Sequence, residues 1–458
     1  MAFITGTTYD IFVTTGQAVF IGETSDPNNP PPPVPGDFNL EVVISGGSFG
    51  NDTPAAGYQG LAYLSANGKT LTAWHGDFGI VDSGGNDSIT LGDGNTSVLG
   101  AVGDTLLGGS GANQFLDGHL GHENVSGRLS VLGSAAPPGG NLTIWGGPGD
   151  TLFGGAYGNV TIGGVPGDTI FAGNGNVFID ASAGNQTINF NLSGNVTIWG
   201  GPGDLINAPI ITSDVSATVG GAPGDTIGGG PGFFIDGSQG NQSITGGHLI
   251  WGGPGDTIHG GGIGSETIGG FSDTVFGGAG ASDFIDGSRG NEFITGGSSG
   301  NETIWGALTD TITGGTGGNE TIAGVQHETI AGGAANTFLD ATSGNESIVA
   351  GTGNTTVWGG AHDTVRGTSS GSGLIGFAGG NETFWDDGAT SGRHDSISTF
   401  NQPGGDRVSL NSATDTAGGV AGTAVTDGSG NTTVTLHDGS TITFIGISSV
   451  NGTFFTTH

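Results

Sequence analysis

Single buried-type aliphatic residues, each flanked by polar ones, recur along most of the chain at a fixed distance. In the second half they return about every 18 residues, at Ile250, Ile268, Ile285, Ile304, Ile322, Leu339, Val357 and Ile375. Side chains alternate between the two faces of a β-strand, so an inward Ile304 places Thr303 and Trp305 outward. The pattern therefore predicts very short strands with one apolar side chain each.

A longer repeat is superimposed on this period. Five tryptophans stand 54, 52, 54 and 53 residues apart, at Trp145, Trp199, Trp251, Trp305 and Trp358. Three coils of about 18 residues thus make one tryptophan repeat. A fixed period over some 300 residues is the signature of a solenoid, in which each coil buries its apolar side against the next. We predict an all-β protein, a parallel β-solenoid of roughly 16 coils.

Breaks in the period divide the chain into five predicted parts. They are an N-terminal β arm (1–25), a proline-rich linker (26–36), an N-terminal cap (37–82), the solenoid repeats (83–385) and a β-rich C-terminal cap (386–458). A two-stranded arm is only marginally stable alone, so it must dock. It docks either on its own solenoid or on a neighbouring subunit. Spacing breaks between Asp117 and Leu142, and between Ile206 and Val219, predict looped insertions.

The composition is extreme in glycine and in acidic residues. The 458 residues include 102 Gly, and 41 acidic against 6 basic side chains give a formal charge of −35. Such repulsion destabilises a compact state, so counter-ions are expected, and divalent cations are the most effective ones. Nucleic acid and anionic membranes are excluded as partners on the same ground. No segment is long enough to span a bilayer, and residues 1–6 have no secretory signal pattern.

Several acidic residues follow the coil period. Asp150 and Asp168 are 18 residues apart, and Asp256 and Asp273 are 17 apart, so each pair should stack on adjacent coils. Carboxylates about 5 Å apart repel by roughly 1 to 3.5 kcal/mol, and a bridging Ca²⁺ with oxygen ligands reverses that sign. Alternatively, they are solvated turn residues. The candidate calcium ligands are Asp87, Asp150, Asp168, Asp256, Asp273, Asp310, Glu328 and Asp363.

The turns carry a family resemblance. Half-coils read Gly-Gly-Pro-Gly-Asp-Thr-Ile or Gly-Gly-x-x-Gly-Asn-x-Thr-Ile, and the run 85–89 reads Gly-Asn-Asp-Ser-Ile. This pattern resembles the glycine-rich nonapeptide repeat of RTX proteins, the calcium-binding β-roll family exported by type I secretion. The resemblance implies a β-roll-like coil in which Asp and turn carbonyls hold calcium between coils. Most half-coils depart from the nonapeptide by one residue.

The C-terminal region resembles the ends of type I secretion substrates. The similarity rests on the runs 394–400, 405–410 and 436–444. It implies an uncleaved export signal, and therefore a protein that folds outside the cell or on the bacterial cell surface. The same runs also fit a β-hairpin cap over the last coil, and both roles can hold together.

One outward column is predicted to read tryptophan, small residue, aspartate over and over. Its large and acidic members are Trp145, Asp180, Trp199, Asp236, Trp251, Asp286, Trp305, Asp340 and Trp358. At ~4.8 Å per coil the indoles should lie roughly 14 Å apart in line. Such a face suggests a partner surface. It could pack laterally against like copies, stack on sugar rings, or have each indole folded flat over adjacent glycines.

No catalytic group stands out. Arg289 occupies a position where the other repeats have Ala183, Gln239 and Ser343, and no nucleophile with a nearby base emerges. We therefore expect no enzyme, but a secreted structural protein, stabilised by calcium, that self-assembles into a filament, surface layer or matrix. The alternative is a polysaccharide-binding or surface adhesin, with a polysaccharide-acting enzyme a distant third.

Overall fold

The computed structural model describes strand backbones from Thr7 onward and side chains over most of the chain. The side chains described are those of 67–71, 79–82, 84–109, 113–118, 120–121, 140–155, 158–189, 194–208, 216–280, 282–334, 336–370, 372–386, 388 and 392–458. Contacts group the residues into two units, Met1–Phe234 and Ile235–His458. Strand β23 (Phe233–Gly237) contains the boundary between them.

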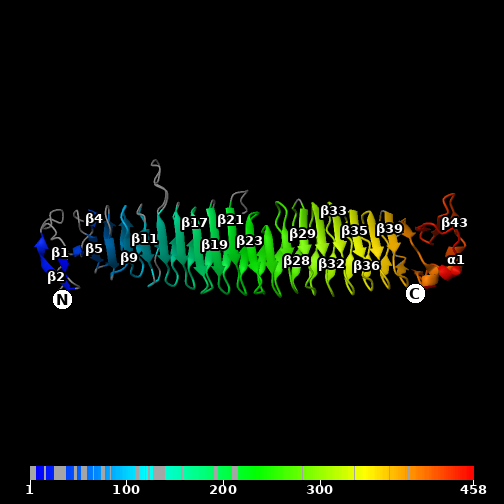
Figure 1. Ribbon diagram of the computed structural model, residues 1–458, viewed down its shortest axis with the longest axis horizontal. Helices are drawn as coiled ribbons and strands as arrows, with labels where there is room; N and C mark the ends of the chain where they lie inside the picture. The colour runs from blue at the N-terminus through cyan, green and yellow to red at the C-terminus, as the bar shows by residue number, and fades with distance from the viewer. Residues whose placement is uncertain are drawn as a thin grey trace. The chain divides into compact units, whose positions relative to one another are not determined.

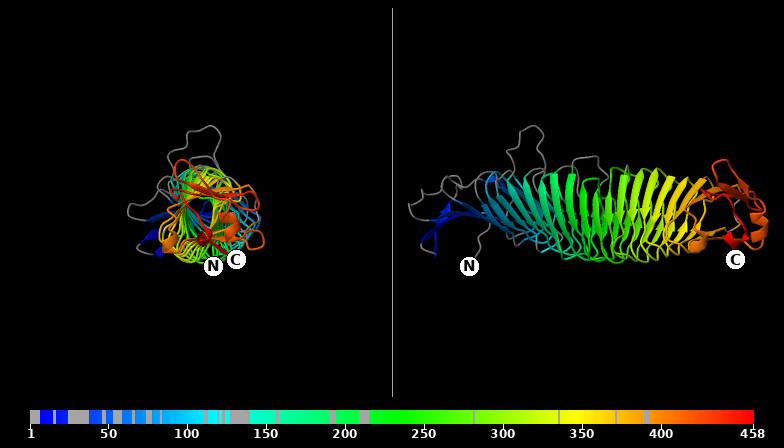
Figure 2. Two further views of the ribbon diagram at one scale, coloured as in Figure 1. Left: turned by 90° about the vertical axis from the view of Figure 1, so that its right-hand side faces the viewer. Right: turned by 45° about the vertical axis from the view of Figure 1, so that its right-hand side comes forward.

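Unit 1 contains two parallel sheets whose strands alternate along the chain (Figures 1 and 2). Sheet 1 of this unit consists of β3 (Phe38–Ser45), β5 (Gln59–Leu64), β7 (Phe78–Asp82), β9 (Thr96–Leu99), β11 (Asn113–Asp117), β13 (Asn141–Trp145), β15 (Asn159–Gly163), β17 (Asn176–Ala181), β19 (Gly194–Gly200) and β21 (Val215–Gly220). Sheet 2 consists of β4 (Phe49–Asp52), β6 (Thr70–Ala73), β8 (Ser88–Leu91), β10 (Thr105–Leu107), β12 (Asn124–Ser126), β14 (Thr151–Phe153), β16 (Thr169–Phe171), β18 (Thr187–Asn189), β20 (Leu205–Asn207) and β22 (Thr226–Gly228).

Unit 2 repeats this arrangement. Its sheet 1 consists of β25 (Leu249–Gly252), β27 (Thr267–Gly269), β29 (Ser282–Asp286), β31 (Asn301–Trp305), β33 (Asn319–Ala323), β35 (Asn336–Ala341), β37 (Thr355–Gly359), β39 (Ser372–Phe377), β41 (His394–Ser398) and β45 (Thr441–Phe444). Its sheet 2 consists of β24 (Ser243–Thr245), β26 (Thr257–His259), β28 (Thr274–Phe276), β30 (Phe293–Thr295), β32 (Thr311–Thr313), β34 (Thr329–Ala331), β36 (Ser347–Val349), β38 (Thr364–Arg366), β40 (Thr383–Trp385), β42 (Arg407–Leu410) and β46 (Phe455–Thr457).

The predicted fold class is confirmed: the chain is a parallel β-solenoid of about 16 coils of about 18 residues, with almost no helix. Each coil contributes one strand to each sheet. A sheet 2 strand such as β32 buries one side chain, whereas a sheet 1 strand such as β31 buries two. Ile304 of sheet 1 and Ile312 of sheet 2 are both fully buried, as are their counterparts on neighbouring coils. The core of each unit therefore contains one continuous aliphatic column from each sheet, stacked one coil at a time.

Turns between the strands use left-handed backbone, as the Gly and Asn clusters predict. In one such turn Gly184 and Asn185 have φ of 76° and 55°, and Asn291 has φ of 61° in the equivalent position of a later coil. These residue types adopt positive φ at little cost. Asparagines also stack along one edge of sheet 1, where Asn159 Nδ2 donates to Asn141 Oδ1 over 3.2 Å. The turns therefore add hydrogen bonds between coils as well as reversing the chain.

The solenoid extends past both of the predicted boundaries. Strands β3, β5 and β7, which lie within the predicted N-terminal cap, already pair in parallel as the later coils do. At the other end β45 continues sheet 1 and β46 continues sheet 2. At the C-terminal end the step between paired residues grows from about 18 to 47, from Ile397 to Phe444, which is why the sequence period does not reveal this coil.

Antiparallel strands lie at the end of each unit remote from β23. In unit 1, β1 (Thr7–Thr14) pairs with β2 (Gln17–Thr24) and with β3 of the same chain. In unit 2, β43 (Val425–Thr426) and β44 (Thr432–Thr435) extend sheet 1 beside β45. A short helix α1 (Ala417–Ala421) and the 3₁₀ turns η1 (Gln402–Gly404) and η2 (Gly452–Phe454) complete this end. The proline-rich linker and the centres of the two predicted insertions lie outside the described residues.

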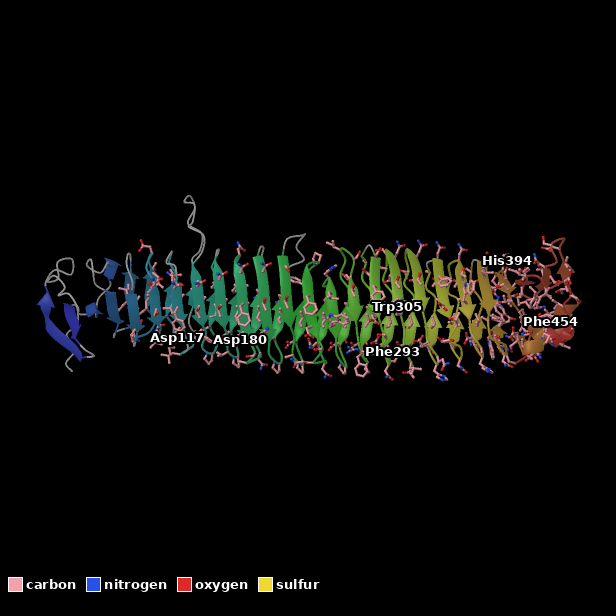
Figure 3. All side chains as sticks on the ribbon, in the orientation of Figure 1. Asp117, Asp180, Phe293, Trp305, His394 and Phe454 are labelled. Atoms are coloured by element: carbon pink, nitrogen blue, oxygen red, sulfur yellow. The ribbon has the colours of Figure 1, made fainter. Side chains whose placement is uncertain are left out.

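Aromatic packing closes the C-terminal end of unit 2. Phe400 stacks on Phe454 at 5.3 Å between ring centroids, and Phe444 meets both rings edge to face. The three side chains are buried, and Phe454 is labelled in Figure 3. This apolar plug covers the last core side chains, which would otherwise face water.

Candidate functional site

The predicted calcium ligands all fall in one buried row. We call it the carboxylate row; it occupies the position two residues before the buried aliphatic residue of sheet 2. In unit 1 its described members are Asp87, Asp104, Asp150, Asp168, Gln186, Asp204 and Asp225. In unit 2 they are Gln242, Asp256, Asp273, Glu292, Asp310, Glu328, Glu346, Asp363, Glu382 and Asp406. Unit 2 thus stacks nine buried acidic residues on nine successive coils.

Backbone amides satisfy most of the aspartates in this row. Asp256 accepts the N–H of Gln242 on the preceding coil at 2.8 Å and the N–H of Gly253 in its own turn at 2.9 Å. The same two bonds are made by Asp168, Asp273, Asp310 and Asp363. These amides place positive partial charge beside the carboxylates. The aspartates therefore tie each turn to the coil before it, and their role as calcium ligands stays a prediction.

Burial leaves the row with raised pKa values. Loss of hydration raises the pKa of Asp273 to about 7, against the lowering effect of its amide hydrogen bonds. Burial raises the pKa of Glu328 to about 8, and the charge of Asp310 adds to the shift. Glu328 accepts one backbone bond, from Val325 N at 2.9 Å, while no donor reaches its Oε1. Protons therefore remain on part of this row near neutral pH.

Two glutamates of the row, Glu292 and Glu346, are almost fully buried. Glu292 has no hydrogen-bond partner for either oxygen. Burial raises the pKa of Glu346, and its interaction with the carboxyl group of Asp363 raises that pKa further. In earlier repeats the same position holds a glutamine that does have a partner: Gln186 Nε2 donates to Ala181 O at 3.2 Å, and Gln242 Nε2 donates to Gly237 O at 3.1 Å. Only a protonated carboxylic acid could replace that donor.

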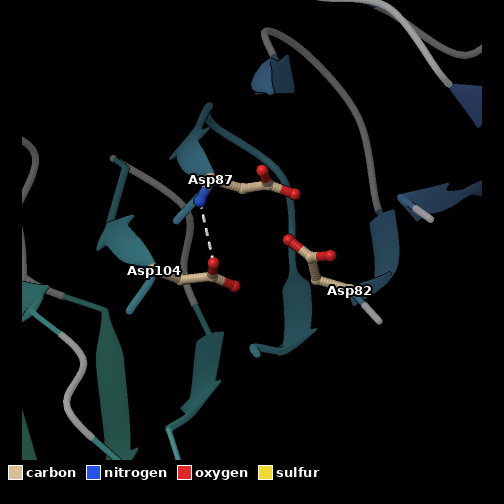
Figure 4. A group of neighbouring side chains, drawn as sticks. All are labelled: Asp82, Asp87 and Asp104. Carbon is tan, nitrogen blue, oxygen red and sulfur yellow. Dashed lines mark hydrogen bonds between the residues drawn. The ribbon is translucent and has the colours of Figure 1, made fainter. Parts of the chain in front are cut away.

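Three aspartates at the start of the row form a tighter cluster (Figure 4). One carboxylate oxygen from each of Asp82, Asp87 and Asp104 lies within 4.8 Å of the other two, and all three residues are buried. Asp104 accepts from Asp87 N at 2.9 Å, but no donor reaches Asp82 Oδ2 or Asp87 Oδ2. Burial and the neighbouring carboxyl groups raise the pKa of Asp82 to about 8. Either a shared proton or a hard cation would remove this repulsion.

Unit 2 has a second row of buried acids, in sheet 1, at the position two residues before the buried aliphatic residue of that sheet. It consists of Glu266, Asp283, Glu302 and Glu320 on successive coils, where unit 1 has apolar side chains at the equivalent positions Leu142, Val160, Val177 and Val196. Paired glycines cover it: Gly297 N donates to Glu302 Oε1 at 2.6 Å, and a Cβ on Gly297 would lie 1.8 Å from Gly278 O. The sequence analysis missed this row, although the repeated Asn-Glu-Thr-Ile run is its signal.

The predicted outward column is in register in both units. In unit 1 the strands align Trp145, Gly163, Asp180 and Trp199. In unit 2 they align Trp251, Gly269, Asp286, Trp305, Ala323, Asp340, Trp358 and Gly376. Asp236 lies in unit 2 one coil before Trp251, at the end of β23. The tryptophans are 41–59% exposed. Three coils therefore separate successive indoles within each unit.

The indoles pack in two ways. A Cβ on Gly163 would lie 2.3 Å from Trp145 Cε3, and a Cβ on Gly269 would lie 2.6 Å from Trp251 Cε3, so these two rings lie over the glycine of the next coil. Trp305 instead meets the edge of Phe284 on the preceding coil, at 5.1 Å and 86°. Packing of the indole over an adjacent glycine, one of the three alternatives predicted for the column, thus occurs at Trp145 and Trp251. Both rings remain about half exposed.

Comparison with protein-family models finds no matching family, and comparisons with curated proteins and with solved structures find no match either. The resemblance to RTX repeats and to type I secretion substrates therefore stays a prediction. Among the described residues, no helix has the length and apolar character needed to cross a membrane.

Proposed function

We propose that this chain is an extracellular structural protein that associates laterally with copies of itself through the tryptophan column. The observation that supports the proposal is the register of that column, which repeats a half-exposed indole every third coil on one face of each unit. Exposed aromatic groups in line form a large apolar patch on an otherwise polar surface. Burying such a patch against a second copy is the usual way to remove it from water.

The ends of the two units favour side-by-side contacts over end-to-end ones. Added antiparallel strands change the pairing at the two ends of sheet 1, where β1 and β2 lie beside β3 and where β43 and β44 lie beside β45. An end that switches to antiparallel pairing does not continue the parallel stacking into another copy. The cis pairing of β1 with β3 also favours docking of the N-terminal arm on its own chain.

Calcium enters the proposal at two places. The formal charge of −35 opposes lateral contact, and divalent cations screen it. Among the described residues, the donor set that fits a hard cation best is Asp82, Asp87 and Asp104, because three carboxylate oxygens within 4.8 Å of one another can all contact one ion. A calcium ion there would be held by those three carboxylates.

Sedimentation velocity and negative-stain electron microscopy, each with and without calcium, test the proposal. We expect the wild type to associate in calcium and the triple variant Trp251→Ser, Trp305→Ser, Trp358→Ser to remain monomeric with an unchanged circular dichroism spectrum. Phe293→Ser is the matched control, since Phe293 is 63% exposed but lies on sheet 2 (Figure 3). Association of the triple variant, or its loss in the Phe293 variant as well, would reject the column as the interface.

A further inference from the structure

A hollow of about 250 Å³ interrupts the outward column in unit 2. It is lined by Trp251, by the glycine of the next coil, Gly269, and by the charged side chains of Asp236, Asp286 and Arg289. The two aspartates belong to equivalent turns three coils apart, so the hollow is one full repeat wide. A volume of this size is slightly below that of pockets for drug-sized ligands. It suits one ring-sized group rather than a folded partner.

The groups around the hollow are held in place. Asp286 Oδ1 accepts the N–H of Ser288 at 3.0 Å, and Asp236 Oδ1 accepts the N–H of Ser238 at 3.1 Å. Each bond fixes a carboxylate while its second oxygen keeps acceptor capacity. Trp251 is oriented by its contact with Gly269, and it is the least exposed of the five column tryptophans. A preorganised site loses less side-chain entropy on binding.

Arg289 distinguishes this repeat from the others. The equivalent positions hold Ala183, Gln239 and Ser343, so only this turn brings a guanidinium to the column. Its charge acts on the buried Glu292, where it opposes the rise in the pKa of that carboxyl. The formal charges of Asp236, Asp286 and Arg289 sum to one negative charge, which disfavours an anionic ligand.

We propose that this hollow binds one neutral sugar ring of an extracellular glycan. The ring would stack its C–H face on Trp251, donate a hydroxyl hydrogen to Asp286 and accept from Arg289, while Asp236 lies at the other end of the hollow. An aromatic plate beside fixed acceptors and a planar donor is the chemistry that recognises a polyhydroxylated ring. The next repeat cannot form the same floor, because Ala323 replaces Gly269 beneath Trp305. The site goes beyond self-association: it shares Trp251 with the assembly proposal, but Asp236, Asp286 and Arg289 take no part in that proposal.

Titration calorimetry with cellohexaose, laminarihexaose, maltohexaose and hexagalacturonate tests the site, on protein kept monomeric by calcium-free buffer. At least one neutral hexasaccharide should bind to the wild type. Trp251→Ala and Arg289→Gln, which installs the residue of the preceding repeat, should each weaken binding about tenfold or more. The control Trp305→Ala should change it less than twofold.

Three results would overturn the proposal. They are failure of every neutral hexasaccharide to bind, binding of hexagalacturonate alone, and an equal loss in the Trp305 and Trp251 variants, which would mean that the column as a whole binds. The Arg289 variant separates the two proposals, because Arg289 lies outside the tryptophan column. Arg289→Gln should weaken glycan binding and leave sedimentation in calcium unchanged, so failure of one proposal can be told from failure of the other.

Discussion

At the scale of single residues, the exchange between Gln242 and Glu292 is the most informative feature of the carboxylate row. Both side chains are buried at the same position, but only Gln242 has a donor to give to a turn carbonyl. Burial raises the pKa of Glu292 to about 8, with added repulsion from Asp310. The folded chain therefore holds a proton here that the unfolded chain releases above about pH 4.5.

A reciprocal swap tests this interpretation. Glu292→Gln should stabilise the protein by about 1–3 kcal/mol at pH 9, because a neutral donor replaces a buried charge, and should have little effect at pH 4.5. Gln242→Glu should do the opposite, destabilising the protein only as the pH rises. Denaturant unfolding of both variants at the two pH values measures the effect. A destabilised Glu292 variant at pH 9 would contradict it.

Residue-scale chemistry was only partly predictable from the sequence. The Asp-Thr-aliphatic tripeptide marks Asp150 or Asp256 as row members, but Glu292 and Glu346 alternate with glutamine and lack that signature. Asp82 lies close to the carboxylate row because of the path of the chain between the end of β7 and the next turn. The repeat period of the sequence does not predict that path. The amide bonds that satisfy the aspartates also cannot be deduced from spacing alone.

At the scale of elements, the structural repeat is three coils, since the outward column returns to tryptophan only after three strands of sheet 1. Sheet 1 pairs Trp305 with Ala323, then Ala323 with Asp340, then Asp340 with Trp358. Nearest-neighbour stacking makes such repeats nearly interchangeable. The sequence predicted this architecture well because inward residues, turns and outer column all share one period.

Deleting one whole repeat should therefore leave a folded protein. Removal of residues 288–341, which are 54 residues, joins Gly287 to Thr342 and restores an equivalent turn. We expect cooperative thermal unfolding within a few degrees of the wild type. Removal of residues 288–314, which is 27 residues or one and a half coils, places a sheet 2 segment in sheet 1 and should abolish folding. Equal behaviour of the two deletions in circular dichroism melts would disprove the modular account.

At the scale of the whole molecule, the buried acids set the pH dependence of stability. Burial raises the pKa of Glu346 to about 9, of Glu302 to about 7 and of Glu266 to about 7, all above their ordinary value of 4.5. A raised pKa in the folded state gives stability that is complete below the ordinary pKa and is lost as the pH rises through the raised value. The chain should therefore behave as an acid-tolerant protein.

The melting temperature should fall steadily between pH 5 and pH 9 in calcium-free buffer. Calcium should raise the melting temperature again at pH 8. At a hundredfold excess over its dissociation constant, it should add about 2.7 kcal/mol to the free energy of unfolding. The double variant Asp82→Asn, Asp104→Asn should lose that calcium increment and keep the rest of the profile. A melting temperature that rises over this pH range would contradict the raised pKa values, and a calcium increment retained in the variant would exclude this cluster as the site.

The assembly and glycan proposals both depend on a column of indoles that keeps its register through unit 2. The chain has no cysteine, so cysteines placed at 251 and 358 alone can carry spin labels. Six strand spacings of ~4.8 Å separate these positions, and double electron–electron resonance should give one narrow distance near 29 Å. A broad distribution, or a distance above about 40 Å, would show that the indoles do not share one face and would remove the basis of both proposals.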